Sequence, residues 1–149
     1  MLFLAGSQDM TSLYEKGVRA IWENASSVNR SLLTFDNAGH NAAAPMPAPE
    51  ESFRYDEKLG FNVSAHYIDK VWDTVRMNNI AQHFSTAFMD LHLKGEPDKA
   101  VYFNLIPNAA DGLVDLDDAG LPTGDHTYWR GFGPRTAAGM QFESKPRGQ

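Results

Sequence analysis

Two short apolar runs organise the N-terminal part of the chain. Leu2 to Ala5 is continuously apolar rather than alternating, which is typical of a strand buried on both faces, as in a parallel sheet. Leu32 to Phe35 repeats this pattern further along. Between the runs, Ser12 and Glu15 match the spacing of a helix capping box, and apolar residues continue at helical spacing to Asn24. We therefore predict a strand–helix–strand unit with parallel strands and a right-handed crossover.

A long amphipathic stretch lies in the middle of the chain. From Ala65 to Leu93 the apolar residues fall at helical spacing, so we predict a long helix, which Asn78 and Asn79 kink or divide in two. Gly95 and Pro97 end this helix. Its apolar stripe consists of Ile68, Val71, Trp72, Val75, Ile80, Phe84, Ala87, Phe88 and Leu91.

The remaining segments are irregular. Residues 42–49 hold three prolines and four alanines, which predicts an extended loop. Residues 96–149 are rich in glycine, proline and aspartate, with possible short strands at 101–105 and 139–143. We expect this irregular tail to pack on the same domain as residues 1–95, which carry the α/β core. The aromatic anchors expected to hold the tail are Trp129, Phe132 and Phe142.

Composition limits the class of protein. The chain of 149 residues suits one domain, and 42% hydrophobic residues are enough for a packed core. The formal charge of −6 argues against nucleic acid or an anionic membrane as partner. The absence of cysteine excludes disulfides and thiolate catalysis. Because no apolar run approaches the roughly 18 residues of a membrane span, and no secretory signal is visible, we expect a soluble chain, cytoplasmic if Met1 is the native start.

Asp9 and His40 are the candidate catalytic residues. Each follows a predicted strand closely and has a glycine nearby, Gly6 in one case and Gly39 in the other. Neighbouring parallel strands end at the same edge of a sheet, where open α/β sheets place their ligands. We therefore expect the Asp9 carboxylate to orient the His40 imidazole and stabilise its charged form. The simpler alternatives are a loop histidine bonded to the backbone and a carboxylate that favours the helix after it.

The other histidines do not suggest a metal site. His83 and His92 lie too far apart on the predicted helix to share an ion, because ligands on one helix face need a spacing of three or four residues. His66 and His126 have no ligand-like neighbours at a useful spacing. No phosphate-binding glycine pattern occurs either. We expect neither a metal nor another cofactor.

Two further candidates are weaker. Asp69 and Asp73 lie four residues apart, but Lys70 and Arg76 surround them, which favours a solvated helix face. Ser7 follows the first strand but precedes Asp9 by only two residues, so both cannot flank one imidazole as nucleophile and orienting acid. No G-x-S-x-G nucleophile motif occurs anywhere.

The two strand–loop segments, Leu2 to Asp9 and Leu32 to Asn41, resemble the end of an α/β-hydrolase domain of the dienelactone-hydrolase-like type. That family places its triad in the order serine, acid, histidine. The resemblance implies that Asp9 is the acid and His40 the base. It also implies that Val71 to Phe88 belongs to the long C-terminal helix that packs on the sheet of such a domain. It also implies that the nucleophile and the oxyanion hole belong to a part that this chain lacks. The expected function is a partial serine hydrolase for small carboxylic esters or lactones.

Other functions remain open. The expected partner is either a missing N-terminal half or a second copy, because two central-type strands cannot cover their edges in so small a sheet. In the second case the chain would be a non-catalytic α/β interaction module that is stable as a homo-oligomer. A nucleotide-binding module is a third hypothesis, which the lack of a glycine-rich loop makes weaker.

Overall fold

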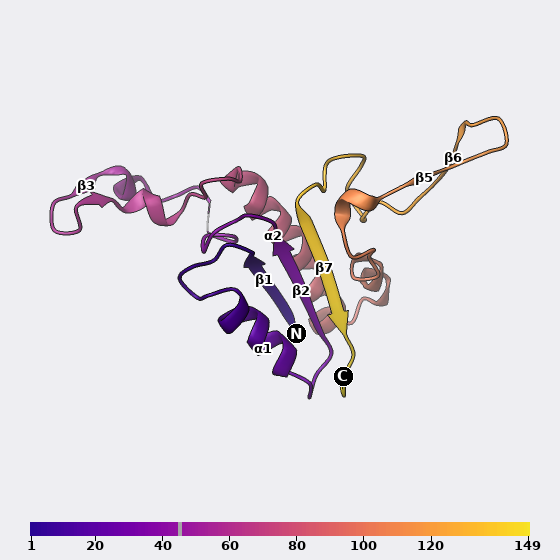
Figure 1. Ribbon diagram of the computed structural model, residues 1–149, viewed down its shortest axis with the longest axis horizontal. Coiled ribbons are helices and arrows are strands. Elements are labelled where there is room, and N and C mark those ends of the chain that lie inside the picture. Colours follow the sequence, from indigo (N-terminus) through magenta and orange to yellow (C-terminus); the bar gives the residue numbers. More distant parts are fainter. Residues whose placement is uncertain (45) are drawn as a thin grey trace.

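A computed structural model describes residues 1–44 and 46–149 of the chain. Its main sheet has three strands in the order β1-β2-β7, formed by Leu2–Gly6, Arg30–Phe35 and Met140–Lys145 (Figure 1). β1 and β2 are parallel, which confirms the predicted strand–helix–strand unit. β7 confirms the short strand predicted at 139–143 and pairs antiparallel with β2. The fold is therefore mixed α/β, and the C-terminal segment supplies part of the sheet.

The first helical connection is shorter than predicted. It consists of a π-helical turn, Glu15–Arg19, followed by α1, Ala20–Asn24. The predicted capping box of Ser12 and Glu15 does not form, because the Ser12 N–H donates to the carboxylate of Asp9 instead. The helical turn thus begins only after the loop that Asp9 organises.

The long helix also begins later than predicted. α2 spans Thr74–Met89 and continues into a π-helical turn, Asp90–Lys94. Asp73 fixes the start, because its side chain accepts the N–H of Arg76 as an N-cap. The expectation of a helix from residue 65, ending the fold as a C-terminal helix, is therefore wrong.

Two consequences follow for the stripe on this helix. Ile68 and Val71 lie before α2 and are more than half exposed, so they are not core residues. Asn78 does not interrupt the helix; its side-chain amide donates to the carbonyl of Ala44. The residues of α2 that are buried are Met77, Ile80, Ala81, Phe84 and Ala87.

α1 packs on the β1–β2 part of one face of the sheet, and α2 covers the other face (Figure 1). Alternation along β2 sends Leu33 to the α2 side and Leu32 to Trp22 of α1. The larger core on the α2 side includes Trp129 and Phe142, both almost fully buried. Two of the predicted tail anchors are thus core residues, and Phe132 packs on them partly buried.

Two segments extend away from this body (Figure 1). One carries the small β3–β4 pair, Tyr55–Asp56 with Phe61–Asn62, and the other is the β5–β6 hairpin, Val114–Leu116 with Pro122–His126. The predicted strand at 101–105 is wrong, because Pro97 starts a 3-10 helix there. The predicted loop at 42–49 includes Pro45, which lies outside the described residues. The short 3-10 helices are Glu50–Phe53, Val63–His66, Pro97–Tyr102 and Ala109–Asp111.

One edge of the sheet has no partner within the part of the chain described. β1 pairs with β2 on one side only. The run of Leu2 to Ala5 has no charged residue or proline that would protect an edge from pairing. The expectation of a second copy or a missing half stays a prediction. Over residues 1–44 and 46–149, no helix is long and apolar enough to cross a bilayer.

Candidate active site

Asp9 lies in the loop after β1 and is held from several sides. Its side chain is only 6% exposed. Oδ1 accepts the N–H groups of Thr11 and Ser12 at 2.8 and 2.9 Å. The backbone of the same loop is tied to the end of β2, since the Ser7 N–H donates to the Phe35 carbonyl at 3.0 Å. Asp9 therefore has a fixed position that leaves Oδ2 free to contact a residue from the next strand.

His40 supplies that contact. Its Nδ1 lies 3.0 Å from Oδ2 of Asp9. A carboxylate can only accept, so Nδ1 carries the proton and donates it, which leaves Nε2 with a free lone pair in the neutral ring. The imidazole is half exposed, at 49%. No hydrogen bond joins Nε2 to any described residue. The structure thus brings together the two residues singled out in the sequence.

A close approach of two backbone segments makes this contact possible. A Cβ on Gly6 would lie 2.2 Å from the carbonyl oxygen of Gly39 and 2.4 Å from that of Ala38. Only glycine fits at this position, because both obstacles are backbone atoms. The absent side chain lets the loop that carries His40 lie directly against the end of β1.

The pair opens into a hollow of about 440 Å³ beside β1. Apolar side chains from Leu4, Val18 and the alanines 42–44 form much of its wall. Asp9, Ser12, His40 and His66 supply polar groups. The hollow can therefore hold a small, largely apolar group beside His40.

The charge of Asp9 is stabilised in place. Burial raises the pKa of this carboxyl, but the hydrogen bonds from His40, Ser12 and Thr11 outweigh it, and the net pKa lies below the ordinary value of 3.8. Asp9 is therefore an anion at neutral pH. In that state Oδ2 accepts the Nδ1 proton and orients the imidazole.

This pKa predicts how Asp9 affects stability. Since the folded-state pKa is lower than the unfolded one, the contribution is fully present above pH 3.8 and disappears as the pH falls through the folded-state value. We expect Asp9→Asn to cost about 1–3 kcal/mol at pH 7, because a charge-assisted hydrogen bond is lost. Urea unfolding of both proteins between pH 7 and pH 2 should show this difference shrink below pH 4. A constant difference would contradict the assignment.

No described serine lies where a nucleophile belongs. The Ser12 hydroxyl is 3.4 Å from His40, but on Nδ1, the nitrogen already held by Asp9. A triad requires the nucleophile at the other nitrogen. The Ser7 hydroxyl instead accepts the Asn37 N–H. The dyad is thus an acid–base pair whose nucleophile is not among these two hydroxyls.

The remaining histidines are placed apart from the pair, except His66, which lines the same hollow. His83 contacts the tail: its Nε2 lies 3.0 Å from the Arg130 carbonyl, and burial lowers its pKa. The His92 ring lies 4.4 Å from that of Phe88, tilted by 55°, and His126 lies in the exposed β6. Within the described residues, no group of three or more acidic or histidine side chains could hold a metal ion.

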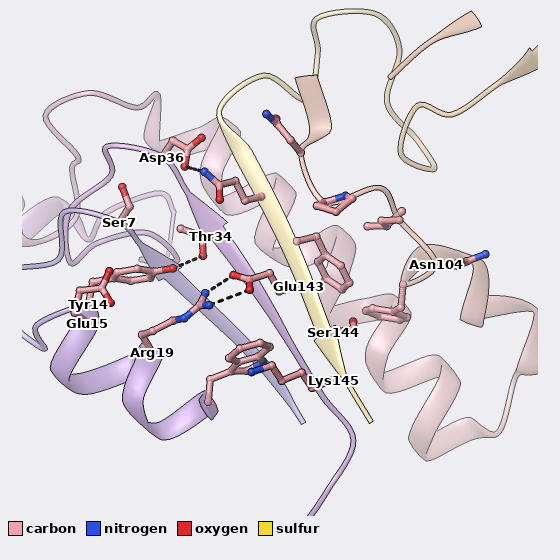
Figure 2. Close-up of a pocket in the computed structure, with 17 residues that line it drawn as sticks. Ser7, Tyr14, Glu15, Arg19, Thr34, Asp36, Asn104, Glu143, Ser144 and Lys145 are labelled. Carbon is pink, nitrogen blue, oxygen red and sulfur yellow. Dashed lines mark hydrogen bonds and ion pairs between the residues drawn. The ribbon is translucent and has the colours of Figure 1, made fainter. Parts of the chain in front are cut away.

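A larger hollow of about 950 Å³ lies on the α1 face of the sheet and contains neither Asp9 nor His40. Figure 2 shows that its polar groups face one another: Arg19 meets Glu143, and the Tyr14 hydroxyl meets Thr34. Gln141 donates to Asp36 in the same way, at 2.8 Å. These three pairs therefore bind one another across the hollow.

Sequence reasoning missed the residues that hold the His40 loop. Asp69, assigned there to a solvated helix face, accepts the Gly39 N–H at 2.7 Å. Asn41 donates its side-chain amide to the Ile68 carbonyl at 2.9 Å. The signal for Asp69 was local: an aspartate shortly before a helix often accepts the N–H groups that follow it. Its contact with Gly39 is long-range and leaves no mark in a single sequence.

Comparisons with models of protein families, with curated proteins and with solved structures give no match. The resemblance to α/β-hydrolases therefore remains a prediction from the residues quoted above. The assignment of function has to come from the geometry of Asp9 and His40.

Proposed function

We propose that this chain carries the acid–base part of a serine hydrolase site for small carboxylic esters or lactones. The observation that supports the proposal is the 3.0 Å contact between buried Asp9 and half-exposed His40, at the ends of two parallel strands. His40 would take a proton at Nε2 from a nucleophile and return it to the leaving group. Asp9 would hold the tautomer and stabilise the imidazolium.

The nucleophile in this proposal comes from a polypeptide segment outside this chain. Two observations support that view. Among the described residues, Nε2 has no partner and no strand pairs with the edge of β1 beside the hollow. A strand added along β1 would end next to Asp9 and His40, because neighbouring parallel strands end together. Such a strand could deliver a serine at the open side of the imidazole.

The chain alone should therefore show only the reactivity of the Asp9–His40 pair, without attack by a serine nucleophile. We expect slow hydrolysis of p-nitrophenyl acetate that depends on the imidazole and is mostly lost in His40→Gln. The matched control is His126→Gln, which changes an exposed histidine on the β5–β6 hairpin and should keep the rate. Measurement of initial rates against buffer, with folded state checked by circular dichroism, tests the role of His40.

A fluorophosphonate probe, followed by intact-mass spectrometry, tests the missing nucleophile. We expect no stoichiometric adduct, since no described serine hydroxyl is aligned with Nε2. Stoichiometric labelling of a serine in this chain would overturn that part of the proposal. Equal rates for His40→Gln and His126→Gln would overturn the catalytic role of the pair.

A further inference from the structure

A short segment before α2 holds the His40 loop from both sides. The carboxylate of Asp69 accepts the N–H of Gly39, the residue before His40, at 2.7 Å. The side chain of Asn41, the residue after His40, donates to the carbonyl of Ile68 at 2.9 Å. His40 is thus flanked by two ties to the same segment, while its own ring contacts Asp9.

Asp69 also fixes the segment to which it belongs. Its other oxygen, Oδ1, accepts the N–H groups of Val71 and Trp72, each at 2.8 Å. The indole N–H of Trp72 then donates to the carbonyl of Asp36, at the end of β2, at 2.7 Å. One carboxylate therefore links the His40 loop, the turn before α2 and, through Trp72, the strand that leads to the loop.

The charge on Asp69 is favoured by these contacts. Burial raises the pKa of this carboxyl, but the hydrogen bonds from three backbone N–H groups outweigh burial. The net pKa therefore lies below the ordinary value of 3.8. At neutral pH both oxygens are acceptors, so the turn and Gly39 can be bound at the same time. A neutral amide has a single acceptor oxygen and could satisfy only one of the two sides.

We propose that Asp69 is a positioning residue that sets the orientation of His40 toward Asp9. The inference rests on the proposed role of His40, but the position of the ring can be measured without any activity. Loss of the Gly39 bond would free the backbone beside His40, so that the imidazole no longer keeps one orientation toward Asp9. The turn of Val71 and Trp72 can persist in Asp69→Asn, because the remaining oxygen can accept both N–H groups.

The test compares Asp69→Asn with Asp73→Ala by NMR. Asp73 is the N-cap of α2 and makes no bond to the His40 loop, so Asp73→Ala reports the effect of weakening the helix start alone. In Asp69→Asn we expect amide exchange at Gly39 to accelerate about tenfold or more. We also expect His40, in long-range nitrogen–proton spectra, to lose its single Nδ1–H tautomer. Asp73→Ala should change neither signal.

Three results would overturn the proposal. The first is a His40 tautomer that stays unchanged in folded Asp69→Asn. The second is a change of the His40 tautomer in Asp73→Ala as large as that in Asp69→Asn. If Asp69→Asn does not fold, the unmodified protein decides: an unprotected Gly39 amide there would rule out the bond. Because none of these measurements uses catalysis, the positioning role of Asp69 can be disproved while the proposed ester hydrolysis stands. The proposed hydrolysis can likewise be disproved while the positioning role of Asp69 stands.

Discussion

Gly6→Ala should disrupt the candidate site more than any conservative change at its polar residues. The added Cβ would lie 2.2 Å from the Gly39 oxygen and 2.4 Å from the Ala38 oxygen, far inside contact distance. Since both are backbone atoms, the strand end and the His40 loop must separate. We expect a loss of stability of about 1–3 kcal/mol or more. We also expect the His40 ring to lose its hydrogen bond to Asp9.

Gly133→Ala is the matched control, because nothing lies within 4 Å of its added Cβ. That substitution should change the free energy of unfolding by no more than about 0.5 kcal/mol. Urea unfolding measures the stability of both variants, and nitrogen–proton NMR of His40 reports the bond to Asp9. A stable Gly6→Ala protein that keeps a single Nδ1–H tautomer would show that the two loops are not in direct contact.

The pairing of Asp9 with His40 was accessible from the sequence, because two apolar runs without alternation indicated neighbouring parallel strands. Because parallel strands end at the same edge, this pairing places Asp9 and His40 together. The close approach at Gly6 was not accessible, since the glycines were read there only as residues near the strand ends. The roles of both residues in catalysis stay predictions, because a hydrogen bond between them shows contact and does not show a reaction.

The start of α2 was not accessible by spacing alone. Ile68, Val71 and Val75 fit a helical stripe, yet each is at least half exposed, at 53%, 65% and 51%. The side chains of Asp69 and Asp73 bind nearby backbone N–H groups and so compete with a continuous helix. Periodicity records which residues are apolar, and it does not show which of the two aspartates, Asp69 or Asp73, starts the helix.

The place of β7 was also only partly accessible. Burial alternates along its first residues, with Met140 and Phe142 buried and Gln141 exposed, which is the pattern of a strand. The partner could not be read from that pattern, because β2 lies more than a hundred residues earlier in the chain. A tail described as irregular therefore contains the third strand of the main sheet.

Phe84→Ala should cause the largest loss of stability in the core. The ring is 1% exposed and lies at the centre of an aromatic cluster. Its centroid is 5.8 Å from that of Trp129, edge to face, and 5.9 Å from that of Phe142, stacked. Truncation removes these contacts and leaves a cavity, which costs about 3–5 kcal/mol for a buried phenylalanine. Urea unfolding followed by tryptophan fluorescence measures the loss.

Val75→Ala is the control on the same helix, since Val75 is 51% exposed and should tolerate the change within about 0.5 kcal/mol. Phe84→Leu should fall between the two, at about 1–2 kcal/mol, and remains informative if the alanine variant does not fold. A cost below about 1 kcal/mol for Phe84→Ala would mean that the tail does not pack on α2 as described.

The same experiment tests whether residues 1–95 and 96–149 unfold together. Phe84 comes from the first part, whereas Trp129 and Phe142 come from the second, and Phe142 lies in a strand paired with β2. A sheet and a core built from both parts should unfold in one transition. We expect circular dichroism and tryptophan fluorescence to give the same midpoint in every variant. Two separate midpoints in Phe84→Ala would show that the tail detaches while the β1–β2 unit, with Asp9 and His40, stays folded.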